Sequence, residues 1–193
     1  MALILVFQAL HPGTASGREH DLRGNSPADQ FEIPRTLPAH PGTIQLLADS
    51  DYYPTLTTLI QGAVQSIDLA MFLFKAAGNN RPAMIAEELI KARKRGVRVR
   101  VILENSGYDQ KLNQANNSVA EKLKKNQVTV EFDSPKRTAH AKIVVIDRRY
   151  CLVGSHNLTE SALRHNHEFS LLIDSRPLAR ELLDYMEGLR TEE

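Results

Sequence analysis

Between residues 43 and 190, segments with the period of a helix alternate with short apolar segments of strand length. The apolar segment 67–74 (IDLAMFLF) contains almost no polar residue, as expected for a strand covered on both faces. The segment 81–95 has helical spacing and is followed by Gly96, a common C-terminal stop signal. This alternation predicts an α/β fold in which a mixed, largely parallel sheet is sandwiched between helices.

The same periodicity places the remaining elements. We expect strands at 43–47, 67–74, 97–103, 128–132, 141–146, 150–154 and 168–173, and helices at 54–65, 81–95, 112–125, 158–164 and 177–189. No internal repeat is visible in the sequence.

The first 42 residues differ from the rest of the chain. Residues 1–10 (MALILVFQAL) are apolar but only half as long as the roughly 20 residues of a membrane-spanning helix. They resemble the apolar part of a secretory signal, although the basic segment that usually precedes it is missing, and a β-strand is the alternative. Residues 11–42 are rich in Pro, Gly, His and charge and predict a flexible linker. We therefore expect a domain over 43–193 and a periplasmic or secreted protein, with the cytoplasm as the alternative.

Charge is informative through its distribution. The net charge is +1, so overall charge does not require a nucleic-acid partner. The basic run 91–100 (KARKRGVRVR) is half explained by a helix end, where cations complement the helix dipole. Two further basic pairs, Lys136-Arg137 and Arg148-Arg149, flank a polar cluster, and we expect them to bind substrate phosphates.

That polar cluster surrounds a predicted β-hairpin. In an extended strand alternate side chains share a face and lie about 6.5 Å apart, so His140 and Lys142 point the same way. If Arg148 and Arg149 are the two central turn residues, His140 faces Asn157 and Lys142 faces Ser155. A His near a Lys is most often ordinary surface polarity, but the convergence of four polar side chains is rarer.

A phosphate fits such a patch. The imidazole can reach the phosphorus, the ammonium of Lys142 neutralises an oxygen, and the amide of Asn157 can donate to a phosphoryl oxygen. Gly154 is expected to let the backbone approach a ligand closely.

The complete pattern is more specific than any of its parts. The spacing H-x-K-x4-D-x6-G-S-x-N is matched by His140, Lys142, Asp147, Gly154, Ser155 and Asn157. It resembles the HKD motif of the phospholipase D superfamily, and the resemblance extends to Glu168 within Asn166-His167-Glu168. Residues 43–190 resemble its small single-motif members, the bacterial periplasmic endonuclease and the Zucchini-type enzymes. The resemblance implies a phospholipase D-like catalytic domain over 43–193.

The resemblance also implies a role for each motif residue. His140 attacks phosphorus and forms a phosphohistidine, while Lys142 and Asn157 hold the phosphoryl oxygens. Ser155 supports the site, and Glu168 accepts a hydrogen bond from His140 that fixes its tautomer.

Asp147 lies at a strand end, and we expect a structural role in which it pairs with a nearby basic group.

A histidine nucleophile needs a second group that protonates the leaving oxygen, which two-motif family members supply from the same chain. This chain has one motif, so we expect a homodimer in which two copies of His140 share one active site. One copy is then neutral and the other charged, which predicts a bell-shaped pH profile.

We expect no cofactor and no obligatory metal. His156, His165 and His167 lie near the motif, but the sequence has no HExxH and no carboxylate cluster. The single cysteine, Cys151, excludes an intramolecular disulfide and lies in an apolar strand, where a buried, inert thiol is expected.

Three functions remain open. The first is a nuclease that cleaves DNA or RNA, favoured by the basic pairs. The second is a phospholipase D that hydrolyses phospholipid head groups to phosphatidic acid. The third is a non-enzymatic nucleic-acid-binding module, which the complete motif disfavours.

Overall fold

A computed structural model describes residues 42–134 and 136–191, and side chains as far as residue 189. The expected signal-like segment and most of the linker lie outside these residues. Every helix and strand expected after residue 42 is present, with ends displaced by at most three residues. Within the described part of the chain, no helix combines the length and apolar character that a membrane span requires.

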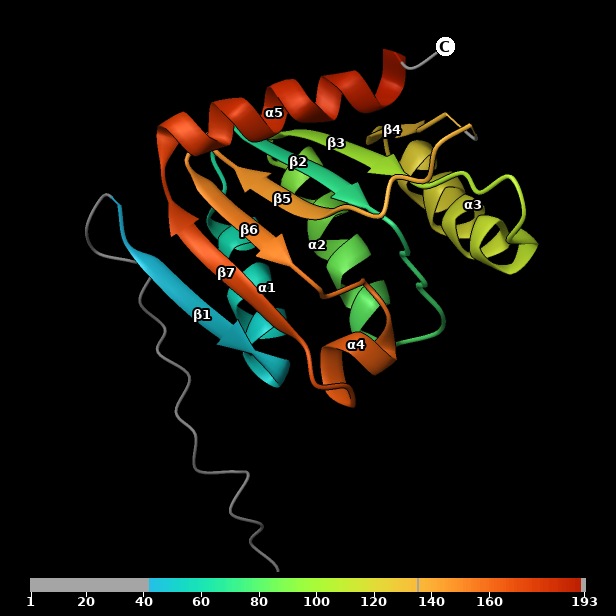
Figure 1. Cartoon of the computed structure of the whole chain (residues 1–193), viewed down its shortest axis with the longest axis horizontal. Helices are drawn as coiled ribbons and strands as arrows, with labels where there is room; N and C mark the ends of the chain where they lie inside the picture. The colour runs from blue at the N-terminus through green and yellow to red at the C-terminus, as the bar shows by residue number, and fades with distance from the viewer. Residues whose placement is uncertain (1–41, 135, 192–193) are drawn as a thin grey trace, which may run out of the picture. The chain divides into compact units, whose positions relative to one another are not determined.

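The strands form one mixed sheet (Figure 1). Among the described residues it has seven strands in the order β1-β7-β6-β5-β2-β3-β4. Their bounds are β1 Ile44–Ala48, β2 Ser66–Met71, β3 Arg98–Leu103, β4 Thr129–Phe132, β5 Lys142–Ile146, β6 Tyr150–Gly154 and β7 Phe169–Asp174.

Helices cover both faces of this sheet, which confirms the predicted α/β class (Figure 1). Helix α5 lies on one face, while α1, α2 and α3 lie on the other. The helices are α1 Tyr52–Gly62, α2 Arg81–Lys94, α3 Gln110–Lys125, α4 Glu160–Arg164 and α5 Arg176–Thr191, and a 3-10 turn at Asp49–Asp51 precedes α1.

The expectation of a largely parallel sheet is wrong. In the described sheet only the pairs β2–β3 and β3–β4 are parallel, and the other four neighbouring pairs are antiparallel. Long helical crossovers through α2 and α3 produce the parallel part. A three-residue turn and the short α4 connect β5, β6 and β7, and short connections favour antiparallel neighbours.

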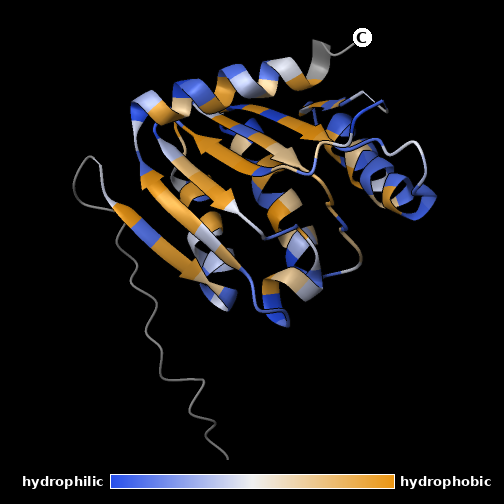
Figure 2. Ribbon diagram, viewed as in Figure 1, coloured by the Kyte–Doolittle hydropathy of each residue, from blue (hydrophilic) through white to orange (hydrophobic). Residues whose placement is uncertain are grey.

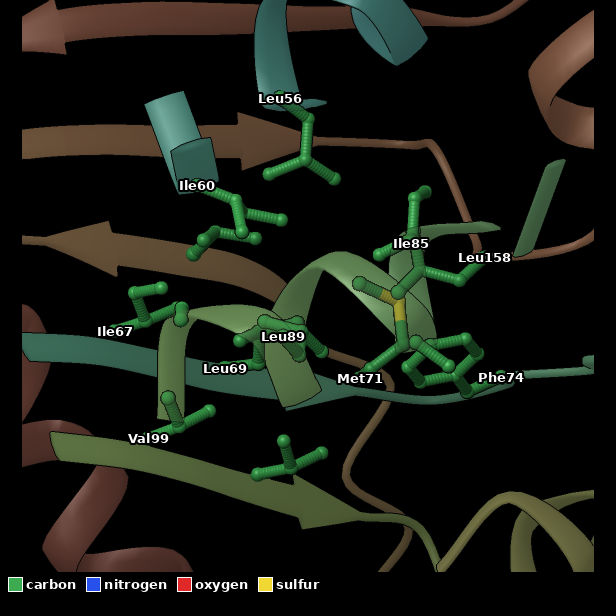
Figure 3. Close-up of a cluster of buried hydrophobic side chains, with 14 of the residues drawn as sticks. Leu56, Ile60, Ile67, Leu69, Met71, Phe74, Ile85, Leu89, Val99 and Leu158 are labelled. Atoms are coloured by element: carbon green, nitrogen blue, oxygen red, sulfur yellow. The ribbon is translucent and has the colours of Figure 1, made fainter. Parts of the chain in front are cut away.

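Two hydrophobic layers hold the sheet between its helices. On the α1–α2 face, Leu69 and Met71 of β2 belong to one buried cluster with Leu56, Ile85 and other apolar residues (Figure 3). On the other face, Val145 and Cys151 lie with Met186 of α5 in a second cluster. The strands are the most hydrophobic elements, whereas the exposed sides of the helices are polar (Figure 2). Burial of each large aliphatic side chain contributes about 1.5–3 kcal/mol.

Local signals in the sequence set the helix ends. The side chain of Asn80 accepts a hydrogen bond from the N–H of Ala83 and caps α2, and Asp109 caps α3 in the same way. Gly96 follows α2 with a φ of +93°, a conformation that glycine adopts without strain.

The β5–β6 hairpin is built differently from the prediction. Its turn has three residues, 147–149, of which Asp147 and Arg148 have φ values of 52° and 51°. Ile143 is therefore paired with Val153, and the predicted register is wrong by one residue.

Candidate active site

The motif residues come together at one end of the sheet. Lys142 begins β5 and is paired with Met71, the last residue of β2. Gly154 ends β6 and is paired with Ser170 near the start of β7, so Ser155 and Glu168 lie at this same end. Because β2, β5, β6 and β7 are neighbours in the sheet, residues from four strands meet here.

His140 and Lys142 are in direct contact. The Nζ atom of Lys142 lies 2.9 Å from Nδ1 and 3.2 Å from Nε2 of His140, and it donates to the carbonyl oxygen of His140 at 2.9 Å. The ring of Phe72 lies against His140, with 4.4 Å between ring centroids, and Lys142 Nζ is 4.9 Å from the Phe72 centroid. The nucleophile candidate is thus held between an ammonium and an aromatic ring.

This arrangement shifts both pKa values downward. Partial burial lowers the pKa of His140, and the neighbouring Lys142 ammonium lowers it further. Burial also lowers the pKa of Lys142 to about 8, an effect that the Glu168 carboxylate partly opposes. A low imidazole pKa keeps His140 neutral near pH 7, the state in which a ring nitrogen can attack phosphorus.

Glu168 does not make the contact that we expected. Its carboxylate accepts a short hydrogen bond from Ser155 Oγ and another from Asn166 Nδ2 at 3.0 Å. Among the described contacts the ring nitrogens of His140 face Lys142 and not Glu168, so the predicted His140–Glu168 hydrogen bond is absent. Glu168 instead fixes Ser155, whose Oγ also accepts from the N–H of Phe169 at 3.1 Å.

Asn157 lies in the loop after β6. Leu158 bridges to Phe74 in parallel fashion, and its N–H donates to the carbonyl oxygen of Leu73 at 3.0 Å, which ties this loop to the segment after β2. Asn157 Oδ1 is buried and has no hydrogen-bond partner among the described residues.

Gly154 lies against the neighbouring strand β7. A Cβ atom at this position would lie 2.3 Å from Ser170 Oγ and 2.4 Å from the carbonyl oxygen of Phe169. Gly154 therefore permits the close approach of β7, while the expected approach to a ligand stays a prediction.

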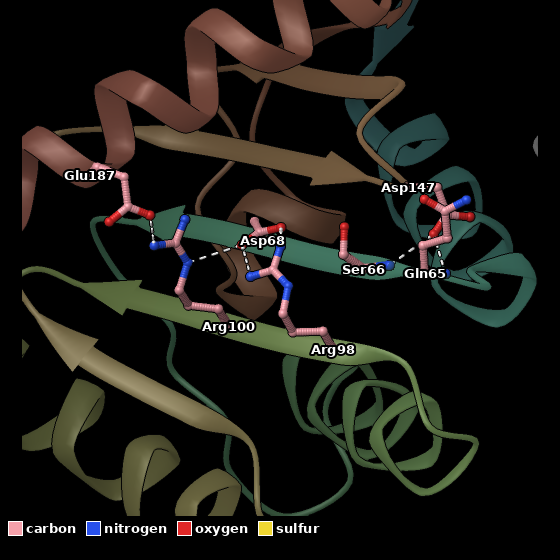
Figure 4. A network of polar contacts seen from close by, with 7 residues as sticks. All are labelled: Gln65, Ser66, Asp68, Arg98, Arg100, Asp147 and Glu187. Carbon is pink, nitrogen blue, oxygen red and sulfur yellow. Dashed lines mark hydrogen bonds and ion pairs between the residues drawn. The ribbon is translucent and has the colours of Figure 1, made fainter.

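Asp147 has a structural role, but its partners are not basic side chains. Its carboxylate accepts hydrogen bonds from the N–H groups of Gln65 and Ser66 at 2.7 and 3.0 Å (Figure 4). It also accepts from the N–H of Val64 at 3.0 and 3.2 Å. It thereby satisfies amides between the end of α1 and the start of β2, at the end of β5 away from His140.

Only one of the two predicted substrate-binding pairs lies beside the site. Lys136 and Arg137 are exposed on the segment that leads into His140. Arg148 and Arg149 occupy the β5–β6 turn at the opposite end of the sheet, so the prediction that they lie beside the same site as Lys136 and Arg137 is wrong. Arg149 instead forms a bidentate ion pair with Asp174, with both distances 2.7 Å. The two basic pairs are close in sequence, but one precedes β5 and the other follows it, so the length of this strand separates them.

The histidines near the motif have unrelated environments. His156 is fully buried, stacks on Tyr52 with 4.4 Å between centroids, and contacts Ser170 Oγ at 2.9 Å. His167 is exposed and pairs with Asp49 at 3.2 Å. Cys151 is buried as predicted, and burial raises the pKa of its thiol to about 12.

Sequence reasoning missed three residues that shape the site. Buried Asn116 of α3 accepts from the N–H of Phe74 and donates to the carbonyl oxygens of Phe72 and Glu104, all at 2.9–3.0 Å. Glu104 and Asp133 follow β3 and β4, and both carboxyl groups accept from the N–H of Ala139. Neither an Asn within a helix nor a single carboxylate after a strand has a local sequence pattern that predicts such hydrogen bonds to the backbone around the site.

A known protein family covers most of this chain. The model of the family described as "Cardiolipin synthase, PLD-like domain" matches residues 56–190. The chain therefore belongs to this phospholipase D-like family.

Individual relatives carry related names. The chain is 36% identical over 101 residues to a "Phospholipase D" of Rickettsia felis, an alignment that covers 52% of this chain and 48% of that protein. It is 29% identical over 140 residues to a "Mitochondrial cardiolipin hydrolase" of Xenopus tropicalis, which covers 72% of this chain and 61% of the relative. The chain thus spans about half the length of the phospholipase D relatives that it matches.

Among solved structures, Nuc from Salmonella typhimurium, described as a phospholipase D family member, has the same fold. It is 23% identical, with a TM-score of 0.63 over 76% of this chain and 93% of that chain.

Proposed function

We propose that this chain hydrolyses phosphodiesters with His140 as the nucleophile. The observation that carries the proposal is the contact between Lys142 Nζ and His140 Nδ1 at 2.9 Å, in a setting that lowers both pKa values. An ammonium held beside a neutral imidazole offers a nucleophile and an anion-binding group within the span of one phosphate.

The reaction has two steps. In the first, a ring nitrogen of His140 attacks phosphorus, the bond from phosphorus to the leaving oxygen breaks, and that oxygen takes a proton from an acid. In the second, water attacks phosphorus, the phosphorus–nitrogen bond breaks, and the water proton returns to the same group. Lys142 and the Asn157 amide stabilise the charge on the phosphoryl oxygens in both transition states.

The acid in this scheme is the partner's His140 in a twofold homodimer. One motif per chain supplies one histidine of this kind, and a twofold axis through the site supplies the second. An apolar strip on the sheet supports this assembly. Ile44 and Leu46 on β1 and Phe169 on β7 are 63%, 61% and 59% exposed, and Phe169 directly follows Glu168 of the site. A second copy that covers this strip would lie next to the active site.

The dimer proposal has a direct test. Leu46→Glu and Phe169→Glu should convert a dimer to monomers in sedimentation velocity and abolish activity, while Met84→Glu at an exposed position of α2 should change neither. Full activity in a monomeric species would contradict the shared site.

Nucleic acid is our first choice of substrate. Lys136 and Arg137 are exposed beside His140 and would contact successive backbone phosphates. Cleavage should then fall steeply as salt concentration rises.

Phospholipid is the second candidate, favoured by two observations. The curated relatives are named phospholipase D and cardiolipin hydrolase. Tyr108, which is 80% exposed, lies between β3 and α3 at the same end of the sheet as His140 and could insert into a lipid interface.

One activity panel distinguishes these candidates. Single-stranded DNA, duplex DNA, RNA, phosphatidylcholine and cardiolipin vesicles are incubated in EDTA with the wild-type protein, His140→Asn and Lys136→Gln/Arg137→Gln. The nuclease proposal expects cleavage of nucleic acid that His140→Asn abolishes and the double variant weakens. Release of lipid head groups without nucleic-acid cleavage selects the phospholipase. Binding without any turnover would indicate a non-enzymatic module.

A further inference from the structure

A basic cavity lies at the end of the sheet away from His140. It has a volume of about 480 Å³ and is lined by Arg98, Arg100, Arg148, Arg176 and Arg180, with Leu183, Asp184 and Glu187 at its side. Arg98 is paired with Ser66 at the start of β2, whereas Lys142 is paired with Met71 at its end. The length of β2 separates the cavity from the proposed active site by on the order of 15 Å.

Two of these arginines have partners within the protein. Buried Asp68 on β2 accepts two hydrogen bonds from Arg98 at 3.0 and 2.8 Å and one from Arg100 Nε at 3.0 Å (Figure 4). Arg100 also forms a close ion pair with Glu187 of α5. These contacts fix one wall of the cavity in a single geometry.

The other three arginines are exposed and have no side-chain partner among the described residues. Arg176 and Arg180 lie four residues apart, and therefore on one face, in the first turns of α5. Arg148 reaches the same cavity from the β5–β6 turn, where its φ of 51° is unusual for a residue other than glycine. Three cations brought together from two elements repel one another unless an anion is present.

Charge in the cavity remains positive after the internal pairs are counted. The five arginines outnumber the carboxylates of Asp68, Asp184 and Glu187. Every cation of the cavity is an arginine, and the planar guanidinium group donates two parallel hydrogen bonds to adjacent phosphate oxygens.

We propose that this cavity binds a phosphate monoester dianion. Three guanidinium groups offer more paired donors than the two terminal oxygens of a diester can accept, whereas a monoester has three terminal oxygens and a higher charge. Free phosphate, the terminal phosphate of a nucleotide chain and the head group of phosphatidic acid share this chemistry. The site differs from the proposed active site, and binding to it does not require that His140 be catalytic.

Calorimetric titration of the full chain with phenyl phosphate and with methyl phenyl phosphate tests the proposal. We expect saturable binding of the monoester and binding of the diester at least about tenfold weaker. Arg176→Gln/Arg180→Gln should weaken monoester binding by about tenfold or more. Arg148→Asn should also weaken it, and Asn tolerates the left-handed backbone at this turn. A triple variant of exposed lysines, Lys94→Gln/Lys111→Gln/Lys125→Gln, removes surface charge elsewhere and should change affinity less than about twofold.

Two further titrations identify the source of the phosphate. Oligonucleotides with and without a 5′-phosphate are compared, as are vesicles with phosphatidic acid and with phosphatidylcholine alone. Tighter binding of the 5′-phosphorylated oligonucleotide, or of the vesicles with phosphatidic acid, supports the proposal and identifies the source of the phosphate. This preference should be lost in Arg176→Gln/Arg180→Gln. Equal binding of monoester and diester, no saturable binding, or an affinity that depends on Lys142 and not on these arginines would overturn it.

Discussion

The carboxyl groups of Glu104 and Asp133 both accept a hydrogen bond from the backbone N–H of Ala139, at 2.6 and 3.1 Å, one residue before His140. The two carboxyl groups also share a hydrogen bond, and burial together with Asp133 raises the pKa of Glu104 to about 7. Both carboxyl groups attach the ends of β3 and β4 to the segment that presents His140, and we expect a proton shared between them to stabilise this contact.

This shared proton makes stability depend on pH. The folded-state pKa of Glu104 lies above its unfolded value, so its contribution is complete below pH 4.5 and is lost as pH rises through about 7. Glu104→Gln needs no proton to donate to Asp133. Between pH 5 and 8 we expect the melting temperature of the wild type to fall on the order of 5 °C further than that of the variant.

Differential scanning fluorimetry across this pH range provides the measurement. Glu121→Gln, at an exposed position of α3, is the matched control and should follow the wild type. If the melting temperatures of the wild type and of Glu104→Gln changed equally with pH, this result would contradict the shared proton.

The Lys142 ammonium and the protonated partner histidine must both keep their charge in the proposed reaction, and we expect Lys142 to set the alkaline limit of activity, because the bound substrate phosphate holds the proton on that histidine. The pKa of Lys142 is lowered to about 8, so the ammonium is lost as pH rises through 8, while the low pKa of His140 places the acidic limit below pH 6.5. Arg keeps its charge at these pH values. Lys142→Arg should therefore lower kcat but move the alkaline limb upward by more than about one pH unit. If the alkaline limb of the pH–activity profile did not move in Lys142→Arg, the limb would report loss of the proton from the partner's histidine instead.

Asp147 should affect stability and not chemistry, although it belongs to the motif. Asp147→Ala leaves the N–H groups of Val64, Gln65 and Ser66 without their acceptor, and we expect a loss of roughly 2–3 kcal/mol in the free energy of unfolding. Asp147→Asn keeps one acceptor and tolerates the positive φ, so its loss should be smaller. Urea unfolding gives these values. A large fall in kcat for the folded Ala variant would show that the carboxylate acts in the reaction.

Gly154 should tolerate no side chain. The Cβ of Gly154→Ala would meet the backbone of β7, and we expect a loss of roughly 1–3 kcal/mol together with displacement of Ser155. Ser170→Ala removes only one of the clashing atoms and should not restore the double variant. Gly62→Ala in α1 meets open space and should be neutral or slightly stabilising. Full stability of Gly154→Ala would mean that β6 and β7 separate easily.

The sequence predicted those features that are encoded locally. Helix and strand positions follow from periodicity and caps. The sequence also predicted that His140 and Lys142 lie on one side of the chain, although His140 precedes β5 and its ring contacts the Lys142 ammonium directly. The hairpin register failed because the left-handed conformation of Asp147 and Arg148 adds a third turn residue. The largely parallel sheet was wrong because strand direction depends on the length of each connection and not on the strand itself.

The missed contacts all join residues distant in sequence. Arg149 is 25 residues from Asp174, and Asn116 is 44 residues from Phe72. Periodicity assigns such residues to an element and a face but does not identify their partner across the fold. Glu168 is one example: its carboxylate accepts a hydrogen bond from Ser155 Oγ, whereas the sequence predicted a hydrogen bond from His140.

The central claim is that His140 becomes covalently bound to phosphorus. Single-turnover reactions with substrate labelled at phosphorus are quenched in base, which preserves a phosphorus–nitrogen bond, and the label is mapped by mass spectrometry. We predict an adduct on the peptide that carries His140, which appears before product and decays as product forms, and none in His140→Asn. Product formation with no labelled protein at any time, or a label on another residue, would contradict the proposed mechanism.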